Sequence, residues 1–269
     1  MEMKSDFKFD YDRTSRIAYI DPGKAERRPI LLLHGLGADA ESWVFQFPVL
    51  MDAGFRPIAI DLPGFGRSGL PTKRWSVKRA AKSIQVWLKE MGIDEFSLVG
   101  HSMGGTVALE LALAHPMRIN KLVLVNTFAR LRMKYFNESR YLARRFVTLN
   151  LRGLPEQAEQ VAARVFPDPS QEVWRKIAIE KISQSDPRIY RQAMLSLALF
   201  DARSRLNHLK MPTLVISSEL DSTVALPIQT EMANLLPNCQ QIVIKQSGHA
   251  VLIDQAEIFN RALVGFLKG

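Results

Sequence analysis

The stretch FSLVGHSMGGTVALELALA, from Phe96 to Ala114, decides the fold. It begins as a short apolar run, typical of a buried β-strand, and continues as a helical pattern that stops before Pro116. Between the two, Gly100 to Gly104 fits the pattern G-x-S-x-G. So tight a strand-to-helix turn strains the backbone of the central serine and projects its hydroxyl above the sheet, near the helix N-terminus. Ser102 is therefore the predicted nucleophile.

Further apolar runs on both sides of this stretch alternate with helical patterns. The predicted strands are Lys8 to Asp12, Arg16 to Ile20, Pro29 to His34, Pro57 to Asp61, Phe96 to Gly100, Lys121 to Asn126, Pro212 to Ile216 and Gln241 to Ile244. The predicted helices are Ser76 to Met91, Met103 to Ala114, Leu226 to Leu236 and Ala256 to Leu267. Such alternation predicts an α/β fold, with a mostly parallel central sheet flanked by helices on both faces.

The alternation stops at Phe128 and resumes after Asn207. Between them the sequence is helical and lacks strand patterns, with helix breakers such as Gly153 to Pro155 and Asp186-Pro187. We therefore predict a core domain made of residues 1–127 and 208–269, and an inserted helical cap of residues 128–207 that covers Ser102.

Composition excludes several classes of protein. The chain has 269 residues, of which 47% are hydrophobic and 23% charged, so it can bury a large core. No apolar run reaches the roughly 18 residues that would span a bilayer, and the charged start does not resemble a signal peptide. Cys239 is the single cysteine, and no Cys/His cluster has zinc spacing. We expect a cytoplasmic protein without a metal, organic cofactor or stable membrane insertion.

Charge is concentrated in the predicted cap. The net charge is +9, and residues 128–207 hold 15 Lys/Arg against 8 Asp/Glu, so +7 of it lies there. The cap residues Arg140, Arg144 and Arg145 share or neighbour one helical face. A solvated face, a subsite for a substrate carboxylate and a weak contact with an anionic surface all remain open. No nucleic-acid motif is present, so we expect no nucleic-acid partner.

A serine hydroxyl needs a base to become a nucleophile. Of the five histidines, His249 lies in a glycine-containing loop after the last predicted strand, which makes it the candidate base. Asp221, after the strand that ends at Ile216, is the candidate carboxylate that orients the imidazole, and Glu219 is its local competitor. The chain order Ser, Asp, His is that of the α/β-hydrolases.

Two backbone amides are candidates for an oxyanion hole. The N–H of Met103 follows the nucleophile, and the N–H of Leu36 lies in the glycine-rich loop after the first long strand. Apolar residues on the cap and around the site are candidates for an acyl pocket. The predicted substrate-binding residues are Trp43, Phe128, Met133, Val224 and Leu252.

These segments together resemble the α/β-hydrolase superfamily over nearly the whole chain. The matching segments are His34 to Gly37, Asp61 to Ser68, Gly100 to Gly105, Leu214 to Asp221 and Gly248-His249. The resemblance implies an α/β-hydrolase fold with an inserted helical cap and a structural role for the Asp61 to Ser68 turn. It is poorly specific for substrate, although serine at position 102 disfavours the branches that place aspartate there.

The expected activity is a cofactor-independent carboxylic ester hydrolase for small to medium acyl chains. The alternatives within the same chemistry are an enol-lactonase and a carbon–carbon bond hydrolase of ring-cleavage products. A non-catalytic small-molecule receptor on the same fold is the alternative from a different class. The expected partner is a small-molecule ester or lactone, and the sequence leaves the oligomeric state open.

Overall fold

The computed structural model describes residues 8–23, 26–131 and 136–269, and of residues 136–142 and 146 only the backbone. Eight strands in this part of the chain form one sheet in the order β1-β2-β4-β3-β5-β6-β7-β8. The strands from β3 to β8 pair in parallel, whereas β1 and β2 form an antiparallel edge. The strands are β1 Phe9–Asp12, β2 Ile17–Ile20, β3 Arg28–Leu33, β4 Phe55–Ile60, β5 Phe96–His101, β6 Ile119–Val125, β7 Thr213–Ser218 and β8 Cys239–Ile244.

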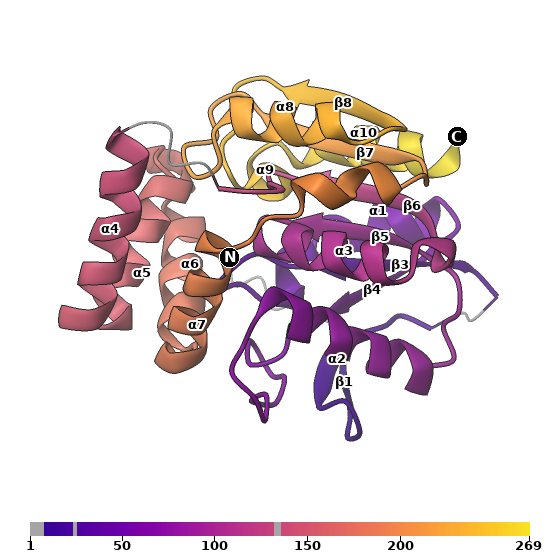
Figure 1. Cartoon of the computed structure of the whole chain (residues 1–269), viewed down its shortest axis with the longest axis horizontal. Coiled ribbons are helices and arrows are strands. Elements are labelled where there is room, and N and C mark those ends of the chain that lie inside the picture. The colour runs from indigo at the N-terminus through magenta and orange to yellow at the C-terminus, as the bar shows by residue number, and fades with distance from the viewer. Residues whose placement is uncertain (1–7, 24–25, 132–135) are drawn as a thin grey trace.

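The central strands are apolar on both faces because helices cover both sides of the sheet. On β3, Ile30 and Leu32 belong to one buried cluster, and Leu31 and Leu33 belong to another. Helices α2 (Val77–Glu90), α3 (Met103–Ala114) and α8 (Leu226–Leu235) supply side chains to the cluster of Leu31. Helices α1 (Phe47–Asp52) and α10 (Ala256–Lys268) supply the other (Figure 1). The predicted α/β-hydrolase architecture is confirmed.

Short helices complete the loops at the ends of the strands. They are η1 Ala40–Trp43, η2 Pro116–Arg118, η3 Pro169–Gln171, η4 Arg203–His208 and α9 Val251–Asp254. Neither α1 nor these one-turn elements were predicted from the sequence, because segments of three to six residues are too short to show a helical period.

In its described residues, the insertion between β6 and β7 holds four α-helices, which group at one side of the sheet (Figure 1). They are α4 Phe136–Leu151, α5 Leu154–Val165, α6 Glu172–Ser183 and α7 Pro187–Ala198. Gly153 separates α4 from α5, and the Asp186 carboxylate caps the N-terminus of α7. A bridge between Arg130 and Asp201 joins the two ends of the insertion, with their side chains 3.7 Å apart. The two chain segments that connect the insertion to the core therefore lie side by side.

Candidate active site

Ser102 lies on the turn between β5 and α3, with φ of 51° and ψ of −116°. A residue other than glycine rarely adopts this conformation, so surrounding contacts must hold it. A Cβ atom at Gly104 would overlap the backbone of Leu33, and one at Gly105 would overlap Thr127. The glycines thus let α3 approach the neighbouring strands closely enough for the turn to form. The Ser102 N–H donates to the Val125 carbonyl at 2.9 Å, which fixes the turn against β6.

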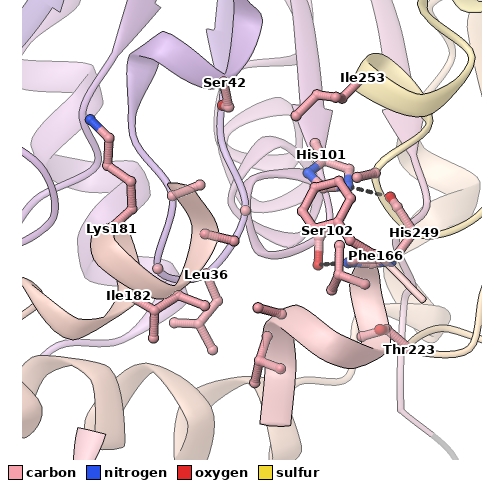
Figure 2. A pocket seen from close by; sticks show the side chains of 18 of the residues that line it. Leu36, Ser42, His101, Ser102, Phe166, Lys181, Ile182, Thr223, His249 and Ile253 are labelled. Carbon is pink, nitrogen blue, oxygen red and sulfur yellow. Dashed lines mark hydrogen bonds between the residues drawn. The ribbon is translucent and has the colours of Figure 1, made fainter. Parts of the chain in front are cut away.

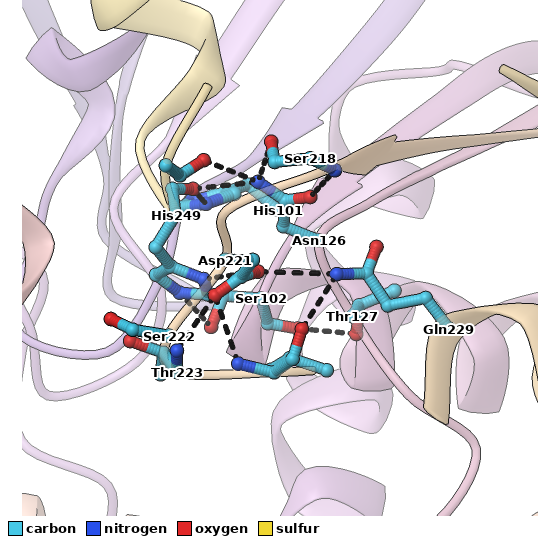
Figure 3. Close-up of polar contacts among 12 residues, drawn as sticks. His101, Ser102, Asn126, Thr127, Ser218, Asp221, Ser222, Thr223, Gln229 and His249 are labelled. Atoms are coloured by element: carbon cyan, nitrogen blue, oxygen red, sulfur yellow. Dashed lines mark hydrogen bonds and ion pairs between the residues drawn. The ribbon is translucent and has the colours of Figure 1, made fainter. Parts of the chain in front are cut away.

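The structure brings Ser102, His249 and Asp221 into one hydrogen-bonded line, although they come from three loops (Figure 3). His249 Nε2 lies 3.0 Å from Ser102 Oγ, and His249 Nδ1 lies 2.9 Å from Asp221 Oδ2. All three loops follow parallel strands and therefore meet at the carboxyl edge of the sheet. An imidazole placed between a hydroxyl and a carboxylate can take the hydroxyl proton and be stabilised when it becomes charged.

The surroundings of Asp221 orient its carboxylate toward His249. The Thr223 and Val224 amides donate to Oδ1 at 2.8 and 2.9 Å, and the Gln229 amide donates to Oδ2 at 3.2 Å. Its competitor in the sequence, Glu219, is exposed and accepts a hydrogen bond from the Gln246 amide instead. Of the two carboxylates, Asp221 is thus the one that contacts His249, and Glu219 faces Gln246.

A second polar network, which the sequence did not predict, holds the loop of His249. The Asn126 side chain donates to the His249 carbonyl at 2.9 Å and to Ser218 Oγ at 2.8 Å, and accepts from the Ser218 amide. His101 Nε2 lies 2.9 Å from the same His249 carbonyl. Burial, followed by the neighbouring His249, lowers the pKa of His101 to about 3, so its ring is neutral and donates to that carbonyl. Asn126 directly follows β6. No local sequence pattern indicated that its side chain would contact Ser218 and His249.

His34 stabilises the loop after β3. Its Nδ1 lies 2.7 Å from the Gly35 carbonyl, and its Nε2 accepts from the Leu62 amide at 2.9 Å. The turn that begins at Asp61 is held in a similar way, because its carboxylate accepts from the Ala40 and Arg67 amides. Burial raises the pKa of Asp61 to about 6. These contacts fix the loop that carries Leu36.

The two amides predicted to form an oxyanion hole lie on segments that flank Ser102. Leu36 lines the same cavity as Ser102, and Met103 is the first residue of α3. In the part of the chain that the structure describes, neither N–H donates a hydrogen bond to a protein acceptor. Both amides are thus available to an oxygen bound near Ser102.

A cavity of about 720 Å³ opens above Ser102 and His249, between the core and the insertion (Figure 2). Three of the predicted pocket residues, Phe128, Val224 and Leu252, line it. Met133 lies outside the described residues. The apolar lining also includes side chains that the sequence could not single out: Leu131, Val161, Phe166, Trp174, Ile177, Ile182, Leu197, Ile228 and Ile253.

The placement of Trp43 corrects the sequence-based prediction. Its side chain is fully buried and does not line the cavity; its ring centroid lies 6.5 Å from that of Phe259 on α10. The loop after β3 turns at η1, which directs Trp43 into the core beneath the loop rather than toward Ser102.

The two basic residues of α4 whose side chains the structure describes, Arg144 and Arg145, do not share one face. Arg144 is exposed, whereas Arg145 is buried, lines the cavity and donates to the Tyr190 hydroxyl at 2.9 Å. The side chain of Arg140 lies outside the described residues. Adjacent helical positions point about 100° apart, so one of the pair faces solvent and the other faces the cavity.

Among the described residues, no group of His, Cys, Asp and Glu is arranged to hold a metal ion. Nor does any helix in the described ranges have the length and apolar character needed to cross a membrane.

Comparison with known proteins identifies the class. The sequence profile of the family described as "alpha/beta hydrolase fold" matches residues 28–256, so the chain belongs to that family. Together with the relatives, this supports a hydrolytic function.

The relatives and structural neighbours extend over almost the whole chain. RutD of Caulobacter vibrioides, provisionally named a carbamate hydrolase, is 31% identical over 258 residues, which cover 91% of this chain and 92% of the relative. A thermophilic esterase from Thermogutta terrifontis is 28% identical, with a TM-score of 0.82 and coverage of 94% and 93%. The enol-lactonase from Burkholderia xenovorans is 23% identical, with a TM-score of 0.87 and coverage of 97% and 100%, and shows the shared fold.

Proposed function

We propose that this protein is a serine hydrolase that cleaves carboxylic esters of small to medium acyl chains. The observation that carries the proposal is the line of hydrogen bonds from Ser102 through His249 to Asp221, at the base of a largely apolar cavity. A cavity of about 720 Å³ has room for a medium acyl chain together with its leaving group.

The proposed reaction begins when Ser102 Oγ attacks the ester carbonyl carbon and its proton passes to His249 Nε2. The negative charge on the carbonyl oxygen is stabilised by the amides of Leu36 and Met103 and by the N-terminus of α3. His249 then gives the proton to the departing alkoxide, which leaves as an alcohol. Water, deprotonated by His249, attacks the acyl carbonyl; the bond to Ser102 Oγ then breaks, His249 returns the proton to Oγ, and the acid leaves. Asp221 keeps Nδ1 protonated and stabilises the imidazolium in both halves.

Carbamates are the second candidate substrates, because relatives at 29 to 31% identity are provisionally named carbamate hydrolases. The same attack on a carbamate carbonyl needs the same nucleophile, base and oxyanion donors. The two candidates differ in electrophilicity, since the carbamate nitrogen donates electrons into the carbonyl. A direct comparison of matched esters and carbamates therefore separates them.

The test is a panel of p-nitrophenyl acetate, butyrate, hexanoate and octanoate, with an N-alkyl carbamate and an enol-lactone as further substrates. Ser102→Ala should lower kcat about a millionfold, while the far-UV circular dichroism stays unchanged. Turnover of esters by the variant at the wild-type rate would refute the nucleophilic role. Turnover of only the carbamate would reassign the substrate class and leave the mechanism in place.

A further inference from the structure

The insertion contacts the loop that carries Leu36 through one lysine. Lys181, on α6, places its Nζ 2.5 Å from Asp39 Oδ2 and 2.5 Å from Glu41 Oε2. The Asp39 side chain is 6% exposed and that of Lys181 is 27% exposed, so this ion pair is largely shielded from water. Interactions between shielded charges are screened less by salt than those between surface charges. The contact is therefore stronger than an ordinary surface pair.

The next residue of α6 packs on the same loop. A Cβ atom at Gly37 would lie 2.8 Å from Ile182 Cγ1 and 3.1 Å from the ring of Tyr190, on α7. Gly37 has φ of +75°, which favours glycine, and its lack of a side chain lets the insertion sit directly on the backbone. Gly37 immediately follows Leu36. Figure 2 shows Lys181 and Ile182 on one side of Leu36 and Ser102 on the other.

The core holds the same loop at its two ends. His34 anchors the start through the Leu62 amide, and Asp61 Oδ1 accepts from the Ala40 amide at 2.8 Å. Next to the second anchor, Lys181 contacts both Asp39 and Glu41, and Arg67 lies 3.5 Å from the other carboxylate oxygen of Glu41. Asp39 also raises the pKa of the Asp61 carboxyl, although burial has the larger effect, so these two acidic groups repel each other. Without the ammonium, the buried Asp39 carboxylate would lose the cation that offsets its repulsion with Asp61, and this favours a shift of the segment after Leu36.

We infer that Lys181 is a positioning residue, which couples the insertion to the loop of Leu36 and thereby aims the Leu36 N–H at the oxyanion. The inference rests on the proposed ester hydrolysis. The insertion then has two roles: it lines the acyl cavity, and it holds the loop whose Leu36 N–H belongs to the oxyanion hole. Lys181 itself does not touch the reacting atoms.

This role predicts a specific kinetic signature. An oxyanion donor acts on the transition state and hardly at all on the bound ester, so its misplacement lowers kcat and leaves KM nearly unchanged. Lys181→Met should lower kcat about tenfold for p-nitrophenyl acetate and hexanoate alike. Lys181→Arg keeps a cation within reach of both carboxylates and should stay within about threefold of the wild type.

The decisive measurements are inhibitor binding and amide exchange. Lys181→Met should weaken binding of an alkyl trifluoromethyl ketone, which forms a tetrahedral adduct with Ser102, by the same factor of about ten as kcat. Binding of the matching alkyl alcohol, which makes no oxyanion, should not change. Amide hydrogen exchange in residues 35–41 should become about fivefold faster or more, because the loop opens more often.

Arg188→Met is the matched control. Arg188 is an exposed cation of the insertion that does not line the cavity and pairs with Asp186 of its own helix. This variant should leave kcat, inhibitor binding and loop exchange as in the wild type.

Two results would overturn the inference. One is unchanged exchange in residues 35–41 of Lys181→Met, and the other is equal loss of ketone and alcohol binding, which would indicate a general change of the cavity. Failure of the proposed function looks different, because wild-type protein would then turn over no ester. Amide hydrogen exchange in residues 35–41 would still decide whether Lys181 holds the loop, since that measurement needs no substrate.

Discussion

The turn at Ser102 and the helical insertion approach the same cavity by different kinds of contact. Backbone atoms build the turn: Ser102 N–H donates to the Val125 carbonyl, and Gly105 N–H donates to the Ser102 carbonyl, both at 2.9 Å. In the insertion, side chains make the contacts with the loops, as Lys181 does with Asp39 and Arg164 does with the Ser222 carbonyl. The position of Ser102 thus depends on backbone hydrogen bonds of the turn. The shape of the cavity depends on side chains of the insertion. Substitutions around Ser102 should accordingly abolish activity, and substitutions in the insertion should reduce it by smaller factors.

After the loss of the Ser102 hydroxyl, the largest effect is expected in the core, from Asp221→Asn. Asparagine keeps the size of the side chain and can still accept from the Thr223 and Val224 amides. Its NH2 group can face His249 Nδ1, which would favour the imidazole tautomer with the proton on Nε2, and that tautomer cannot accept from Ser102. We expect kcat to fall about ten-thousandfold for every acyl length.

Glu219→Gln is the control for that experiment, because Glu219 lies two residues from Asp221 and points to Gln246. It should stay within about twofold of wild-type kcat, as is usual for an exposed side chain away from the reaction. An Asp221→Asn variant that kept a tenth of the wild-type rate would show that another group orients His249.

The same contrast explains what could be predicted from the sequence. The strands, the long helices and the three residues Ser102, Asp221 and His249 carry local signals: apolar runs, a strained turn between glycines, and polar residues that directly follow strands. Parallel strands then bring their carboxyl ends together whatever the details of packing. The central sheet and the arrangement of Ser102, Asp221 and His249 at its edge can therefore be predicted from such local signals.

Contacts between distant side chains have no comparable signal. Trp43 was predicted to line the cavity, but the sequence does not indicate which way η1 turns, and the side chain faces Phe259. The partners of Asn126 are 92 and 123 residues away along the chain, and those of Lys181 are 140 and 142 residues away. Only the three-dimensional packing of the insertion on the core reveals these pairs.

An intermediate effect, on stability rather than selectivity, is expected from His101→Gln in the core. The folded pKa of His101 is about 3, against an ordinary value of 6.5. Below pH 6.5 the unfolded chain therefore binds a proton at this residue that the folded chain does not. The free energy of unfolding falls with pH from 6.5 toward 3, by up to about 1.4 kcal/mol per pH unit for this group.

Glutamine removes the titrating group but can still donate to the His249 carbonyl. Between pH 6.5 and 4.5, the variant should lose about 2 kcal/mol less free energy of unfolding than the wild type. Urea denaturation at four pH values in this interval measures both slopes. The contributions of His34 and Asp61 are present in both proteins and cancel. Parallel slopes would mean that the pKa of His101 is the same in the folded and the unfolded protein.

The smallest effect is expected in the insertion, from Ile177→Ala. Ile177 lies on α6, lines the cavity and is half-buried, so truncation enlarges the cavity without removing a fully buried side chain. Losing part of one apolar contact with a longer acyl chain costs about 1 kcal/mol. We expect kcat/KM for p-nitrophenyl hexanoate to fall about fivefold relative to that for the acetate.

Val147→Ala is the control, since Val147 belongs to the insertion but is 55% exposed and does not line the cavity. Its hexanoate-to-acetate ratio should equal that of the wild type. If Ile177→Ala instead slowed both esters equally, α6 would act on the reacting carbonyl through the loop of Leu36, as Lys181 is inferred to do, and not on the acyl chain. The hexanoate-to-acetate ratio thus shows whether Ile177 affects the preference for acyl length while Lys181, on the same helix, affects kcat.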